Sequence, residues 1–120
     1  MNSKISAAAL AAMGLLVLSF NPANADTQCG GASWYALTSK TASGEPMRAD
    51  KLTAAHKKLP FGTRLKVVNK RNGKAVVVRI NDRGPFVKGR ILDLSKAAAR
   101  ELGFIGAGHT EVCMQVLARP

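Results

Sequence analysis

Two stretches near the middle of the chain carry the hydrophobic patterning of β-strands. Residues 63–69 (TRLKVVN) alternate apolar and polar side chains, so that Leu65 and Val67 share one face, and this predicts a strand with one side buried. Residues 75–81 (AVVVRIN) are apolar almost throughout, which is typical of a central strand. The Asn72-Gly73 pair between them suits a tight turn with positive φ, so the two stretches are expected to form a β-hairpin.

One helix is predicted after the hairpin. Ser95 suits the N-cap position before residues 96–102 (KAAAREL), and Gly103 follows them, as at many helix ends. We therefore predict one short α-helix at about residues 95–100 and a closing strand at residues 111–117. Many short strands, one helix and numerous Gly turns predict a mainly β fold, a small barrel with a helical insertion.

The N-terminus has the three-part layout of a secretory signal peptide. Lys4 supplies positive charge, residues 5–20 form a nearly unbroken apolar run, and residues 23–25 (ANA) are suited to a signal peptidase. An apolar run of about 16 residues is short for a membrane span of about 20, so we expect cleavage after Ala25 rather than a membrane anchor. Residues 26–120 would then form a single periplasmic or secreted domain, and no lipid anchor is expected because no Cys stands at the cleavage site.

Export changes how the two cysteines are interpreted. Cys29 and Cys113 lie near opposite ends of the exported chain, in a compartment that permits disulfides. Free thiols are unusual in exported proteins, and two Cys without clustered His make a poor zinc site. We therefore predict a structural disulfide, worth roughly 4–5 kcal/mol because it closes a long loop.

Charge narrows the class of partner. The chain carries 18 Lys and Arg against 7 Asp and Glu, a net charge of +11, and such a field favours anionic surfaces. Export argues against nucleic acid, and Trp34, Tyr35 and four Phe offer little surface for base stacking. Peptidoglycan carboxylates or cell-surface phosphates are the expected partners, unless the charge serves solubility alone.

Four titratable residues stand in unusual segments. Asp82 follows a predicted strand and begins the DRGPF segment. Its carboxyl group there can face a groove beside the barrel, or it can simply accept hydrogen bonds from the backbone amides of a turn. Glu45 ends the TASGE segment and His56 ends TAAH. The simpler interpretation is that Glu45 is an exposed surface residue and that His56 is a hydrogen-bonded residue of the core. Asp93 precedes the predicted helix, and we expect it to support the fold through helix-start electrostatics.

Trp34 and Tyr35 form a local aromatic pair. Such a pair suits core packing, and aromatic faces are also common platforms for sugars. No Gly-rich phosphate loop, Ser-His-Asp order or cluster of metal ligands is recognisable in the sequence. No cofactor and no metal are therefore expected.

Taken in order, these segments resemble the rare lipoprotein A (RlpA-like) family. The matching segments are GASWY at 31–35, TASGE at 41–45, LTAAH at 52–56, LPFGT at 59–63, NDRGPF at 81–86 and GRILDLS at 89–95. The resemblance covers residues 31–117 and implies a six-stranded double-psi β-barrel, related to expansin-like and barwin-like barrels. We expect no sporulation-related, septum-targeting domain after the barrel.

Family members known to be enzymes are lytic transglycosylases that prefer peptidoglycan strands stripped of stem peptides. The resemblance implies functional roles for Glu45 and His56, and it places the catalytic acid of related barrels at Asp82. The chain departs from the family pattern at Ala36, Met47 and Arg48, the last of which stands where members often carry Asp or Asn.

The reaction implied is cleavage of the glycan strand between N-acetylmuramic acid and N-acetylglucosamine, with anhydro-muramic products. One acid protonates the glycosidic oxygen, and its conjugate base helps the muramic 6-hydroxyl to attack C1. We expect Asp82 to be this group and Glu45 and His56 to position the sugar or share the proton, although Asp82 and Glu45 could exchange roles. Candidate substrate-binding residues are Trp34, Tyr35, Arg48, Arg83 and Lys88.

Two alternatives belong to other functional classes. The barrel could be a non-catalytic, expansin-like module that binds or loosens cell wall, and the opposite charge of Arg48 at a possible acidic position favours this. It could also be a secreted effector or inhibitor that uses the barrel as a scaffold for a protein partner. In each case we expect a monomer.

Overall fold

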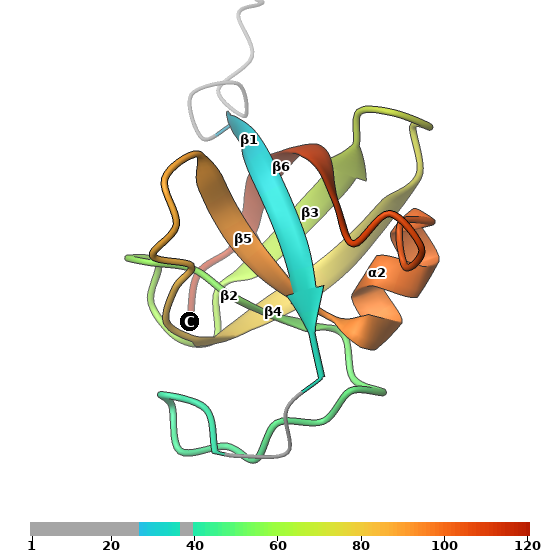
Figure 1. The fold of residues 1–120 in the computed structure, drawn as a ribbon. Helices are drawn as coiled ribbons and strands as arrows, with labels where there is room; N and C mark the ends of the chain where they lie inside the picture. The colour runs from blue at the N-terminus through green and yellow to red at the C-terminus, as the bar shows by residue number, and fades with distance from the viewer. Residues whose placement is uncertain (1–26, 37–39) are drawn as a thin grey trace, which may run out of the picture.

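Six strands close into a barrel in the computed structural model, which describes residues 27–36 and 40–120 (Figure 1). In chain order the elements are β1 (Thr27–Tyr35), β2 (Thr53–Ala55), β3 (Arg64–Asn69), β4 (Ala75–Asp82), β5 (Arg90–Ser95), α2 (Lys96–Leu102) and β6 (His109–Ala118). Around the barrel the order is β1-β5-β2-β4-β3-β6, and β6 pairs with β1 again. The predicted mainly β barrel with a short helix is confirmed. The expected signal peptide, residues 1–25, lies outside the described residues.

Two of the strand pairs are parallel, β1 with β5 and β2 with β4, and the remaining neighbours are antiparallel. A tight turn cannot join parallel neighbours, so the chain must cross over between them. Parallel pairing also places the ends of β2 and β4 at the same edge of the barrel, with Ala55 beside Asp82. This arrangement positions the candidate site.

The β3–β4 hairpin forms as the sequence predicts. The two strands pair antiparallel from Arg64↔Arg79 to Val68↔Ala75, and Gly73 in the turn has a φ of 77°, a region that favours glycine. Leu65 is fully buried while its neighbours Arg64 and Lys66 are exposed, because successive strand residues face opposite sides.

Helix α2 lies beside the barrel (Figure 1), and its buried residues are Ala98, Ala99 and Leu102. Ser95 Oγ accepts a hydrogen bond from the Ala98 N–H, and Gly103 ends the helix in the left-handed region at a φ of 76°, so both predicted caps are confirmed. Within residues 27–36 and 40–120, no helix is long and apolar enough to cross a membrane. The fully buried large apolar side chains of the core are Leu65, Val67, Val78, Ile80, Leu92, Leu94, Leu102 and Val112.

The predicted disulfide is confirmed. Cys29 and Cys113 face each other across the antiparallel β1–β6 pair and are bonded. Because the bridge joins residues 84 positions apart, it fastens the N-terminal strand to the C-terminal strand where the barrel closes.

Replacing both cysteines by serine is expected to lower the free energy of unfolding by about 2–5 kcal/mol, because the bridge restricts the unfolded chain. Urea unfolding of residues 26–120, followed by circular dichroism, measures the difference. Wild-type protein under a reducing agent should match the variant. An unchanged urea midpoint in the variant would show that the bridge does not stabilise the fold.

Candidate functional site

Asp82 stands at the end of β4 with its carboxyl group held by three donors. Its Oδ1 accepts from the backbone N–H groups of Ala42 (2.8 Å) and Arg83 (2.9 Å), and its Oδ2 accepts from the Tyr35 hydroxyl (2.8 Å). A carboxylate offers about four acceptor positions, so one position on Oδ2 remains. The side chain is half-buried. Asp82 therefore accepts hydrogen bonds from backbone amides, as a turn residue does, and also keeps one free acceptor position.

Tyr35 acts on Asp82 through its hydroxyl group. Burial, the hydrogen bond to Asp82, and the negative charges of Asp82 and Asp93 all raise the pKa of Tyr35. The phenol consequently stays protonated and remains a donor to the carboxylate. The predicted substrate-binding residue thus orients the predicted acid.

Asp93 belongs to the same cluster, although the sequence placed it at the start of a helix. Ala55 on β2 is in register with Asp82 on one side and with Asp93 on the other. Asp93 Oδ1 accepts from Ser33 Oγ (2.5 Å) and Arg90 Nη2 (2.8 Å). The expected helix-start role is wrong, because Asp93 lies within β5 and Ser95 caps α2. The alternation of LDLS, with both leucines buried, is the signal that could have found it.

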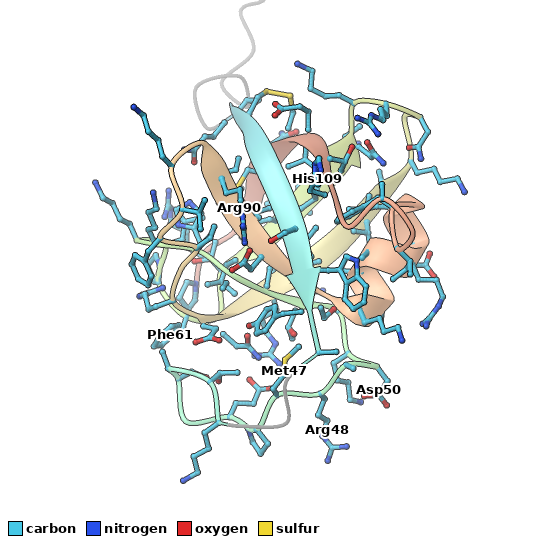
Figure 2. All side chains as sticks on the ribbon, in the orientation of Figure 1. Met47, Arg48, Asp50, Phe61, Arg90 and His109 are labelled. Atoms are coloured by element: carbon cyan, nitrogen blue, oxygen red, sulfur yellow. A yellow bond between two sulfur atoms is a disulfide. The ribbon has the colours of Figure 1, made fainter. Side chains whose placement is uncertain are left out.

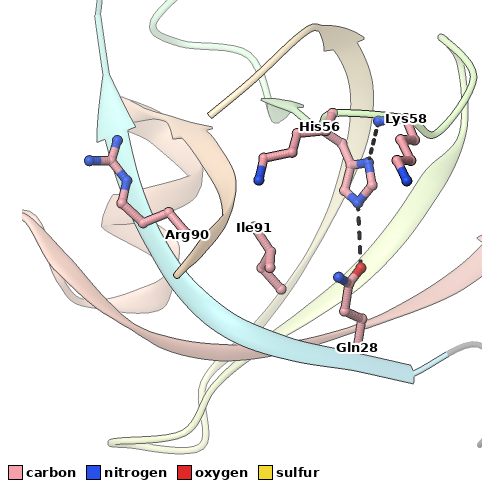
Figure 3. Close-up of a pocket in the computed structure, with 6 residues that line it drawn as sticks. Gln28, His56, Lys58, Arg90 and Ile91 are labelled. Carbon is pink, nitrogen blue, oxygen red and sulfur yellow. Dashed lines mark hydrogen bonds between the residues drawn. The ribbon is translucent and has the colours of Figure 1, made fainter. Parts of the chain in front are cut away.

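His56 follows β2 and lies beside Asp82 through the backbone. Its N–H donates to the Asp82 carbonyl oxygen (3.2 Å). Its ring Nδ1 accepts from the N–H groups of Lys58 and Leu59 (3.0 Å each), so the ring hydrogen resides on Nε2. That Nε2 faces Gln28 Oε1 at 3.5 Å (Figure 3), which makes His56 a donor toward this side.

The surroundings of His56 keep it neutral. Burial and the positive charges of Arg83, Lys57 and Lys58 lower its pKa. A neutral His56 with Nδ1 already occupied cannot accept a proton from a substrate without breaking two backbone hydrogen bonds. The geometry suits a hydrogen-bond donor better than a base.

Glu45 is tied to β4 by an ion pair. Its two carboxylate oxygens accept from Arg79 Nη1 (2.9 Å) and Nη2 (2.8 Å). These bonds are the main reason that the pKa of Glu45 is lowered, so the group is ionised at neutral pH. Residues 40–46 dock beside the same strand, since Ser43 N–H donates to the Asn81 carbonyl and Ala42 N–H to Asp82.

The three basic candidates have different surroundings. Arg83 is engaged internally: its Nη1 donates to the carbonyls of His56 (3.1 Å) and Leu59 (2.8 Å), and its guanidinium carbon lies 4.1 Å from the centre of the Phe61 ring. Arg48 projects outward from the loop below the barrel (Figure 2), and Lys88 is exposed on the loop before β5. Arg48 and Lys88 are thus the more exposed of the three candidates.

Trp34 lies on the other side of β1 from Tyr35, because consecutive strand residues point in opposite directions. Its Nε1 donates to the Ile105 carbonyl (3.3 Å), and Lys96 Nζ lies 5.7 Å from the ring centre. The ring packs against the hydrophobic core. The structure therefore separates the aromatic pair and does not bring Trp34 to Asp82.

Phe86 is an exposed aromatic residue that the sequence did not single out. Its side chain is 79% exposed. A Cβ placed on Gly84 would lie 3.6 Å from the Phe86 ring and 4.0 Å from Asp93 Oδ2, so both groups lie close to the Gly84 backbone. An exposed aromatic face beside a carboxylate cluster is suited to a sugar ring.

A pocket of about 340 Å³ opens beside His56 (Figure 3). It is lined by Gln28, His56, Lys57, Lys58, Arg90 and Ile91. No group of three or more His, Cys, Asp or Glu able to hold a metal ion occurs in the described part of the chain. The chemistry available here is that of carboxyl, phenol and cationic groups.

Comparison with known proteins identifies the family. Residues 27–114 match the family described as lytic transglycolase. The chain belongs to this family. It is 60% identical, over 66% of its length, to a probable endolytic peptidoglycan transglycosylase RlpA of Nostoc. It is 51% identical, over 72% of its length, to the endolytic peptidoglycan transglycosylase RlpA of Neisseria meningitidis.

The expected RlpA-like relationship is therefore confirmed. The chain spans 21% of the Nostoc relative and 37% of the Neisseria relative. Among solved structures, it resembles an expansin of Clavibacter michiganensis with a TM-score of 0.63 and 27% identity, over 78% of this chain and 52% of that one. A Streptomyces papain inhibitor has a TM-score of 0.65 at 21% identity, over 77% and 94%, and shares the fold.

Acidification is expected to destabilise the fold through His56. Its pKa is lowered in the folded protein, whereas the unfolded chain binds a proton near pH 6.5. Below about pH 6.5 the unfolded state therefore binds more protons, and the free energy of unfolding falls by at most about 1.4 kcal/mol per pH unit until the folded-state pKa is passed. Urea unfolding between about pH 7.5 and 5.5 measures this slope.

The matched variants are His56→Gln and His109→Gln. The first should flatten the slope over this range, while the second, at an exposed position, should leave it unchanged. Equal slopes in the wild type and His56→Gln would contradict the assignment.

Proposed function

We propose that this barrel cleaves peptidoglycan glycan strands as a lytic transglycosylase, with Asp82 as the acid/base. The observation that carries the proposal is the Asp82 carboxyl group, held by three donors with a spare acceptor position on Oδ2 in a member of the lytic transglycolase family. Peptidoglycan lies outside the cytoplasm, so the protein would act there after loss of residues 1–25.

The reaction needs one proton donor and one proton acceptor in succession. Asp82 protonates the glycosidic oxygen, the bond from that oxygen to the muramic C1 breaks, and N-acetylglucosamine leaves as the free alcohol. The muramic 6-hydroxyl then bonds to C1 and returns its proton to Asp82. The result is a 1,6-anhydro-muramic end, and the enzyme recovers its starting form without activating water.

The ion pair at Glu45 supports Asp82 rather than Glu45 as the acid. Arg79 occupies both carboxylate oxygens of Glu45 and lowers its pKa, so a proton on Glu45 would disrupt that ion pair, whereas Oδ2 of Asp82 keeps a free position that can carry the proton. Glu45 then serves as a positioning residue that holds residues 40–46 beside β4. The Ala42 N–H of that segment is one of the donors to Asp82.

Asp93 and Tyr35 complete the proposed machinery. Tyr35 holds Asp82 in orientation through Oδ2. Asp93, fixed by Ser33 and Arg90, supplies a second negative charge, which favours the positive charge that develops on the sugar as the C1–oxygen bond breaks. Phe86 offers an aromatic face for the sugar, and His56 offers a hydrogen bond from Nε2.

Asp82→Asn is expected to abolish the reaction, with a loss of at least 100-fold, because an amide cannot cycle a proton. Mass spectrometry of peptidoglycan glycans after incubation with residues 26–120 detects the anhydro-muramic ends. Asp50→Asn, which removes an exposed carboxylate from the nearby loop (Figure 2), is the matched control and should keep wild-type turnover.

The Glu45→Gln variant distinguishes the role of Glu45 from that of Asp82. It should retain measurable turnover, reduced about tenfold or less, because it weakens the hold on residues 40–46 without removing the proton donor. If Glu45→Gln is inactive and Asp82→Asn is active, the roles are exchanged. If the wild type forms no anhydro ends but co-sediments with cell wall, the non-catalytic, expansin-like function replaces the enzyme.

A further inference from the structure

The pocket beside His56 contains two cations, Lys57 and Lys58, that the proposed cleavage step does not use. Three of its lining residues, Lys57, Lys58 and Arg90, are cationic, and none of the others carries a carboxylate. Its volume of about 340 Å³ lies at the lower end of the range for small-molecule sites, roughly 300–1,000 Å³. A pocket of this size and charge suits a small anionic group.

The two lysines are the free cations of this pocket. In residues 27–36 and 40–120 the ion pairs are Glu45–Arg79 and Asp93–Arg90, so neither Lys57 nor Lys58 has a carboxylate partner there. Arg90, in contrast, already donates to Asp93 (2.8 Å) and Ser33 (2.6 Å). Both lysines are exposed, which lets their ammonium groups reach a ligand at the mouth of the pocket.

The neutral groups of the pocket add further donors. His56 Nε2 carries the ring hydrogen, because Nδ1 accepts two backbone N–H groups, and it points toward Gln28 Oε1 (Figure 3). With its oxygen facing His56, the Gln28 amide has its NH₂ group left to donate. The polar lining therefore consists mainly of hydrogen-bond donors, which matches an acceptor-only carboxylate.

The pocket also has an apolar side, formed by Ile91. A Cβ on Gly30 would lie 2.9 Å from Ile91 Cγ2, which means that only glycine lets this side chain lie so close to the β1 backbone. The combination of an aliphatic surface and two free ammonium groups fits a ligand that carries a methyl group next to a carboxylate.

The pocket adjoins the carboxylate cluster at two places. His56 donates its backbone N–H to the backbone carbonyl of Asp82, and Arg90 donates a hydrogen bond to the Asp93 carboxylate. A muramic acid residue carries on O3 a lactyl ether, which consists of a methyl group and a carboxylate. A lactyl group on a sugar bound at Asp82 would therefore lie near the pocket.

We propose that this pocket binds the free lactyl carboxylate of the muramic residue, with its methyl group on Ile91 and its carboxylate between Lys57 and Lys58. This inference rests on the proposed function and adds a determinant of specificity to it. A strand whose lactyl group is free presents the negative charge. A strand whose lactyl group is amide-linked to a stem peptide lacks that charge at this position, and its peptide must also be accommodated.

The first test compares cleavage of two forms of one glycan preparation. One is stripped of peptides and has free lactyl carboxylates, and the other has the same carboxylates converted to methylamides. Wild type should prefer the free acid by about 10–100-fold in kcat/KM, the range expected of a charge-assisted contact. The Lys57→Gln/Lys58→Gln variant should lose that preference, and Lys57→Arg/Lys58→Arg should retain most of it.

The matched control is Lys70→Gln/Lys74→Gln. These lysines are exposed on the β3–β4 hairpin. The hairpin turn lies at the end of α2, because the Asn72 side chain donates a hydrogen bond to the Leu102 carbonyl. The variant therefore removes the same charge at a place outside the pocket. It should keep the preference for the free acid. If both double variants lose it equally, the net charge of the protein is responsible and the pocket assignment is overturned.

A binding measurement keeps the inference separable from the proposed cleavage. In ¹⁵N-labelled protein, N-acetylmuramic acid should shift the signals of Gln28, His56 and Lys58, whereas N-acetylglucosamine should not. Such shifts without any cleavage would support the subsite and contradict the proposed enzymatic activity. Cleavage without a difference between acid and amide overturns the subsite alone. Tighter, lysine-dependent binding of peptide-bearing strands overturns it in favour of stem-peptide carboxylates.

Discussion

The barrel depends on β1 pairing along both of its edges, parallel with β5 and antiparallel with β6. This double pairing joins the ends of the sheet into a closed cylinder, and the bond between Cys29 and Cys113 fastens one of the two seams. Closure removes exposed strand edges and buries one core. The parallel pairs also set the position of the site: β2 lies between β4 and β5, so that its small Ala55 separates Asp82 from Asp93.

Charge is distributed unevenly over this basic protein. Two aspartates and the Tyr35 phenol gather on the neighbouring strands β1, β5, β2 and β4, around Ala55 of β2, although the whole chain has a net charge of +11. The cation that contacts this cluster, Arg90, is fixed by its hydrogen bonds to Asp93 and Ser33. The positive field beyond the cluster favours the approach of an anionic polymer, while the cluster itself retains the carboxyl groups that proton transfer requires.

The basic residues near the site differ in function because their partners differ. Arg79, Arg83 and Arg90 use their planar, multiply donating guanidinium groups on carboxylates and carbonyls of the protein itself. Lys57 and Lys58 have no carboxylate partner among the described residues and can follow a ligand on flexible stems. Arginine thus stabilises the loops that carry the site, and lysine is left for recognition.

Local features were readable from the sequence alone. The β3–β4 hairpin, both caps of α2 and the Cys29–Cys113 pair depend on neighbouring residues, turn chemistry or cysteine count, and ordered motifs identified the family. Strand β2, with only Thr-Ala-Ala, carries no local strand signal and exists because β4 and β5 flank it. The contact of Tyr35 rather than Trp34 with Asp82, the site position of Asp93 and the pocket beside His56 likewise arise from pairing between distant strands. Parallel pairing brings together residues that are far apart in the sequence. A local sequence pattern does not indicate which strand will pair with which, because that is decided by packing between distant segments.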